Sequence, residues 1–82
     1  MQNSINTAEV QSLVFNLSIG PEEYLKYYSG QVKWVLATSS QGLKVRFPAN
    51  LLSPHITHNG INGQFILKYL TSGKAISLNK TV

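Results

Sequence analysis

The segment from Gly42 to Phe65 restricts the fold of this chain more than any other part of the sequence. It reads GLKVRFPANLLSPHITHNGINGQF. Pro48 must end a strand, because proline cannot donate a hydrogen bond to a sheet ladder, and Pro54 is expected to stop the apolar turn Ala49–Leu52. Asn59-Gly60 is a tight-turn signal from which a new strand can start. The elements here are therefore short, and the rest of the chain must supply strands that pair with them.

Alternation of apolar and polar side chains predicts strands on both sides of this segment. The clearest case is Leu13–Ile19, which has the period of a half-buried strand. The last two strands should turn Phe65, Leu67, Tyr69, Ile76 and Leu78 inward. In all we predict strands at Leu13–Ile19, Gln31–Thr38, Leu43–Phe47, Gln64–Leu70 and Ala75–Leu78.

A short helix is predicted between the first two strands. Pro21 suits the first helical position, because its missing N–H would have no partner there. Glu22 and Glu23 follow in the first turn, where the helix dipole favours negative charge. Gly30 is the expected stop. Such a short helix needs to pack on the sheet to be stable.

The register of the hairpin formed by the second and third strands decides which side chains are buried. A four-residue turn at 39–42 places Trp34 opposite Phe47 and Leu36 opposite Val45, all facing inward. A cross-strand pair of Trp34 and Phe47 would be a strong core anchor. The same register turns Val35 outward.

Positive charge is concentrated in the later part of the chain. The 82 residues carry a formal net charge of +4. From Tyr24 onward the sequence has no acidic side chain, whereas all seven lysine and arginine residues lie there. Such a surface attracts polyanions, although it can also serve solubility alone. We expect weak binding of RNA or single-stranded DNA by an outer face formed by Lys33, Lys44, Arg46 and Lys68.

An interaction module is the alternative function. Val35 and Ile66 are both expected to face outward, and together they would form an apolar stripe at a sheet edge. This stripe could pair with a protein partner or with a second copy of the chain.

Enzymatic and metal functions are not expected. The sequence has no cysteine or aspartate, and His55 and His58 have no neighbouring carboxylate in the sequence to orient them. We therefore predict no catalytic residue, no metal site and no cofactor. Neither a signal peptide nor an apolar run long enough to span a membrane is visible, so we expect a cytoplasmic protein.

These elements predict one small, mainly β domain at residues 12–82, after a flexible tail at residues 1–11. Five short antiparallel strands close most economically into an SH3-like or Sm-like barrel, with the helix capping one end. An open sheet with the helix on one face is the alternative architecture.

Three groups of residues also resemble a known family. They are the run EEYLKYY at 22–28 with Gly30, the FPA of 47–49 with Leu52 and Pro54, and the Gly60-Ile61-x-Gly63-x-Phe65 element. Through these three groups the chain resembles DUF2835, a family of short bacterial proteins of unknown function. The resemblance extends from about Phe15 to the end of the chain. Ser53 and His55 depart from the family's more usual arginine and aromatic residue. The resemblance supports the predicted order of elements and implies no activity.

Overall fold

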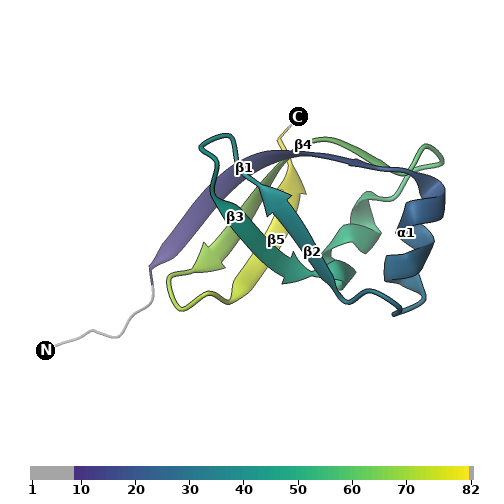
Figure 1. Ribbon diagram of the computed structural model, residues 1–82. Helices are drawn as coiled ribbons and strands as arrows, with labels where there is room; N and C mark the ends of the chain where they lie inside the picture. Colours follow the sequence, from purple (N-terminus) through teal and green to yellow (C-terminus); the bar gives the residue numbers. More distant parts are fainter. Residues whose placement is uncertain (1–8, 82) are drawn as a thin grey trace, which may run out of the picture.

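The computed structural model describes residues 9–81 and is mainly β (Figure 1). Residues 1–8, where most of the predicted tail falls, lie outside the described residues, as does Val82. The first strand begins at Val10, inside that predicted tail. The elements in chain order are β1 (Val10–Ile19), α1 (Pro21–Tyr28), β2 (Trp34–Thr38), β3 (Lys44–Pro48), the 3₁₀ helix η1 (Ala49–His55), β4 (Ile61–Leu70) and β5 (Ala75–Lys80).

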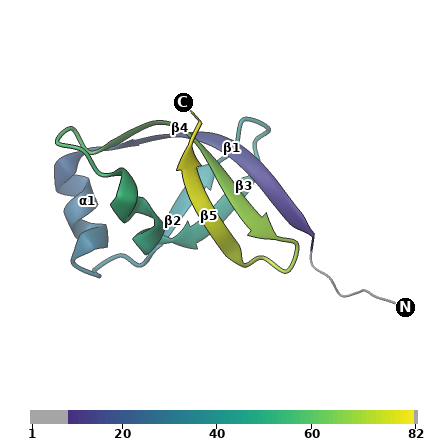
Figure 2. The same cartoon turned by 180° about the vertical axis from the view of Figure 1, so that it is seen from behind.

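The strands form two antiparallel sheets rather than one closed barrel. One sheet has the order β1-β4-β5, and the other is the β2–β3 hairpin, as the two views in Figures 1 and 2 show. A backbone hydrogen bond from Ser40 N–H to the Val14 carbonyl, 3.2 Å long, joins the hairpin side to β1. On the opposite side a cavity opens between Val45 of β3 and Ala75 of β5. The predicted closed barrel is therefore wrong, because no strand pairing between β3 and β5 is present in the described part of the chain.

The inner faces of both sheets enclose one core. Leu13, Phe15, Leu17 and Ile19 of β1 are all buried, as the alternation predicted. The rings of Phe15 and Phe47 stack across the two sheets with their centroids 5.9 Å apart. Stacked aromatic side chains in such a contact contribute both apolar burial and a favourable ring geometry.

The predicted register of the hairpin is wrong by one residue. Val35 pairs with Phe47 and Ala37 with Val45, so Val35 faces the core and is only 2% exposed. Trp34, expected in the core, is 48% exposed. The predicted facing of β3 is confirmed, but that of β2 is reversed.

The turn explains this difference. It contains five residues, 39–43, because pairing resumes at Thr38 and Lys44. Ser39 is buried, and its hydroxyl oxygen accepts hydrogen bonds from the backbone N–H groups of Gln41 (3.2 Å) and Leu43 (3.1 Å). Its own N–H donates to the Leu43 carbonyl. The serine side chain thus takes the place of a ladder partner and adds one residue to the turn.

A β-bulge in β5 turns Ile76 outward, although the alternation predicted that it faces inward. Lys68 pairs with Ser77 and Tyr69 with Ala75, which leaves Ile76 as the extra residue of β5. The bulge shifts the alternation by one position. Leu78 is buried as predicted, whereas Ile76 is exposed.

The two helices cover one end of the sheets (Figures 1 and 2). Helix α1 begins at Pro21, as predicted, and buries Tyr24. The 3₁₀ helix η1 is longer than the predicted turn, because Pro54 lies inside it instead of ending it. Leu52 of η1 is fully buried and plugs this end of the core.

Candidate functional site

The outward side of the β2–β3 hairpin brings together aromatic, apolar and basic side chains. Residues that pair directly across two antiparallel strands share a face. Here the outward pairs are Trp34 with Pro48, Leu36 with Arg46 and Thr38 with Lys44. We call these six residues the hairpin face. Five of them are exposed, and Pro48 is half-buried.

Trp34 and Arg46 are in direct contact on the hairpin face. The guanidinium carbon of Arg46 lies 4.5 Å from the centroid of the Trp34 ring. This distance is within the range of a cation–π interaction, which orients both side chains on an otherwise open surface. The indole is thereby positioned as a flat surface beside a fixed positive charge.

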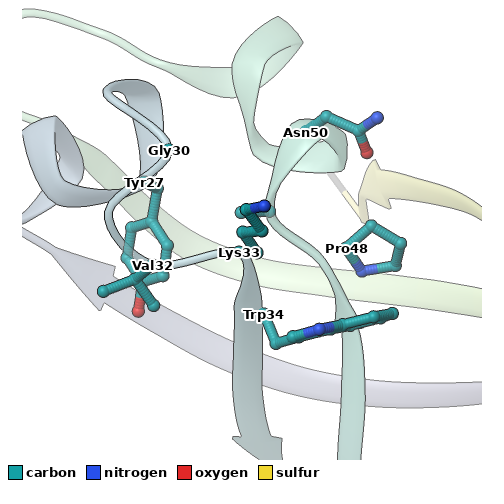
Figure 3. A pocket seen from close by; sticks show the side chains of 8 residues that line it. Tyr27, Gly30, Val32, Lys33, Trp34, Pro48 and Asn50 are labelled. Carbon is teal, nitrogen blue, oxygen red and sulfur yellow. The ribbon is translucent and has the colours of Figure 1, made fainter.

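A pocket of about 350 Å³ borders Trp34 at the end of the hairpin face. Figure 3 shows the indole edge-on beneath Lys33 and Pro48, with Val32 and Tyr27 to one side and Asn50 above Pro48. The pocket lies where the α1–β2 connection meets the start of η1. Its lining residues are Tyr27, Gly30, Val32, Lys33, Trp34, Pro48, Ala49 and Asn50.

Backbone hydrogen bonds hold the walls of this pocket. The N–H of Ala49 donates to the Lys33 carbonyl at 2.9 Å, which ties the start of η1 to the residue before β2. The N–H of Val32 donates to the Lys26 carbonyl at 2.9 Å, which folds the connection back onto α1. The pocket is therefore built from backbone that is fixed on both sides.

Tyr27 contributes an uncharged wall to the pocket. Partial burial raises the pKa of the Tyr27 phenol above its ordinary value, and the negative charge of Glu23 raises it further. The phenol is consequently neutral at physiological pH. It adds no negative charge beside Lys33.

The four basic residues predicted to form one face do not lie on one face. Lys44 and Arg46 lie on the hairpin face, and Lys33 lies beside it at the pocket. Lys68 lies on β4, exposed between the inward-facing Leu67 and Tyr69. Because the inner faces of both sheets enclose the same core, the outer face that carries Lys68 is directed away from the hairpin face.

The predicted apolar stripe of Val35 and Ile66 is wrong. Val35 belongs to the hydrophobic core, because the five-residue turn reverses the facing of β2. Ile66 is half-buried and pairs with Val14 on the outer face of the three-stranded sheet. Of the apolar side chains that the hairpin does expose, Leu36 is the most exposed, at 75%.

The sequence interpretation missed two further placements. Trp34 was expected in the core. Both faces of β2 carry apolar side chains, so alternation alone does not tell which face is turned inward. His55, for which the sequence suggested no role, ends η1. Its Nε2 lies 2.7 Å from the Leu78 carbonyl oxygen, and its ring meets Phe65 edge-on, so it joins η1 to β5. No local pattern in the sequence indicates this long-range contact.

Residues 9–81 contain neither a cluster of metal-ligating side chains nor a membrane-spanning helix. No group of three or more histidine, cysteine, aspartate or glutamate side chains is gathered there in a way that could hold a metal ion. No helix within this range is long and apolar enough to cross a membrane.

Comparison with known proteins identifies a family but no characterised relative. The model of the family described as "Protein of unknown function (DUF2835)" matches residues 11–81. The match confirms the resemblance found in the sequence. Neither the curated proteins nor the solved structures contain a significant match to this chain.

Proposed function

The chain belongs to the DUF2835 family of unknown function, and from the geometry of its hairpin we propose that it is a non-enzymatic module that binds RNA or single-stranded DNA. The proposal keeps the cytoplasmic location expected from the sequence. The proposed binding surface is the hairpin face, in place of the predicted face that also included Lys68.

One observation carries the proposal, namely the contact between Arg46 and the half-exposed Trp34. Proteins that bind single strands combine aromatic rings, on which bases stack, with positive charges that follow the phosphate backbone. Trp34 supplies the ring, and Arg46 and Lys44 supply charge on the same face. Because the sequence has no acidic side chain after Glu23, no local carboxylate from this part of the chain neutralises them.

The expected binding is weak and largely independent of sequence. A few basic residues contact phosphates and release counterions, so affinity should fall steeply as salt rises. The dissociation constant should be on the order of 10 μM at low salt, in the range of non-specific binding.

Fluorescence anisotropy with labelled RNA and DNA oligomers tests this directly. The double variant Lys44→Gln/Arg46→Gln should weaken binding for every sequence and flatten the salt dependence by about one unit for each lost phosphate contact. The matched control is Lys68→Gln/Lys80→Gln, which removes the same amount of charge from the other sheet. The control should retain most of the affinity, because its residues lie outside the hairpin face.

Two results would contradict the proposal. One is the absence of saturable binding at low salt. The other is an equal loss of affinity in both double variants, since that would indicate attraction by net charge alone.

Protein interaction or self-association remains the second candidate, and the exposed Leu36 and Leu43 favour it. They are 75% and 52% exposed and belong to the same hairpin. Sedimentation velocity across micromolar concentrations tests it, because a dimer formed through these side chains should dissociate in Leu36→Lys. A monomer throughout this range would remove self-association through the hairpin.

A further inference from the structure

We propose that the pocket beside Trp34 admits one unstacked nucleobase of the bound strand. This inference rests on the proposed function and specifies what that function would recognise. The ligand is a single-stranded segment whose phosphates lie along the hairpin face while one base turns into the pocket.

The size of the pocket fits this ligand. Its volume of about 350 Å³ is near the lower end of the range of about 300–1,000 Å³ that is typical of small-molecule sites. A single planar heterocycle belongs to that scale. The pocket is also open to solvent.

The lining is suited to a flat and partly polar ring. Trp34 offers a stacking surface, and the rings of Pro48 and Tyr27 supply apolar walls. Asn50 lies at the rim with its carboxamide above Pro48, where an amide can donate to and accept from the edge of a base. Lys33 supplies positive charge at the opening for a neighbouring phosphate.

The arrangement around Trp34 leaves a ring face available. Arg46 contacts the indole by cation–π interaction but does not line the pocket. Arg46 belongs to the next outward pair of the hairpin, with Leu36, whereas the pocket extends from the Trp34–Pro48 pair toward the α1–β2 connection and η1. A base that enters from the pocket can stack on Trp34 while Arg46 keeps its cation–π contact from the hairpin side.

The pocket also lies in line with the basic side chains of the hairpin face. Along the hairpin, Lys44 pairs with Thr38, Arg46 with Leu36 and Pro48 with Trp34. A strand that follows the two basic residues thus arrives at the pocket at the end of the hairpin. One protein domain would in this way combine phosphate contacts with the capture of a single base.

The test compares an oligothymidine with the same oligomer in which every base is replaced by an abasic residue. Anisotropy is measured at one low salt concentration for the full chain. The normal oligomer should bind about tenfold more tightly, because only it can stack on an aromatic ring. In Trp34→Leu this preference should disappear while the weak, salt-dependent binding of both oligomers remains. In Trp34→Phe, which keeps an aromatic ring, most of the preference should remain.

A third variant separates the pocket from the indole alone. Asn50→Leu places a bulkier apolar group at the rim and leaves Trp34 in place, so it should reduce the preference for the normal oligomer. Equal binding of the normal and abasic oligomers by the unmodified protein would overturn the base pocket and leave phosphate binding by the hairpin face intact. If neither oligomer bound saturably, both the pocket and the proposed function would be wrong.

Discussion

Trp34 and Phe47 are large aromatic side chains of the same hairpin, but only Phe47 is fully excluded from solvent. Phe47 is held between the two sheets by its contact with Phe15. Trp34 is held on the surface by Arg46. At the residue scale, one side chain therefore supports the core, and the other is available for binding.

Substitution with alanine should separate these two roles. Phe47→Ala should lower the free energy of unfolding by about 3–5 kcal/mol, because it leaves a cavity in the core. Trp34→Ala should cost less, about 1–2 kcal/mol, since about half of the ring is already exposed to solvent. Urea unfolding followed by circular dichroism measures both. A loss for Trp34→Ala as large as that for Phe47→Ala would place the indole in the core and contradict this account.

Gly60 and Gly73 allow a second comparison at the residue scale. Both have positive φ angles, 92° and 99°, which L residues rarely adopt. A Cβ atom at Gly60 would clash with the Ile19 carbonyl oxygen, whereas a Cβ atom at Gly73 would meet no atom within 4 Å. Gly73→Ala should therefore cost about 1–2 kcal/mol for its backbone conformation alone.

Gly60→Ala should cost clearly more, because the junction of β1 and β4 must also shift to make room. Thermal unfolding of the two variants under the same conditions gives the difference. If the two melting temperatures were equally lowered, the close approach of Gly60 to β1 would be wrong.

At the scale of elements, the turn of the hairpin determines which surface is exposed. Alternation in the sequence predicted the facing of β1 and β4 correctly, because each has one apolar and one more polar set of side chains, although both strands begin three residues before the predicted Leu13 and Gln64. Strand β2 has two apolar sets, so its facing depends on the length of the turn. That length follows from the hydrogen bonds of Ser39, which no periodicity reveals. The bulge at Ile76 is a similar case.

Ser39→Ala tests the contribution of the turn. It removes the acceptor of two backbone N–H groups, so we expect a loss of about 1–3 kcal/mol in the free energy of unfolding. Ser40→Ala is the matched control, because Ser40 is the exposed neighbour in the same turn. Chemical denaturation of both variants provides the comparison. Equal stability of the two variants would show that the Ser39 hydroxyl does not determine the turn.

At the scale of the whole molecule, the arrangement of the two sheets decides which charges act together. The basic residues could be identified in the sequence, and their alternation on β3 placed Lys44 and Arg46 together. Their separation from Lys68 could not be predicted, because it depends on pairing β4 with β1 and β5 instead of with the hairpin. The pocket brings residues of α1, β2 and η1 together and likewise exists only in the folded chain.

The emission of Trp34 during titration with single-stranded oligomers tests the central claim most directly, because it is the only tryptophan in the sequence. If bases stack on the hairpin face, low-salt titration should quench this emission saturably, at the concentrations at which anisotropy shows binding, and added salt should restore it. Binding seen by anisotropy with no change in Trp34 emission would contradict the claim, since the strand would then lie on another surface.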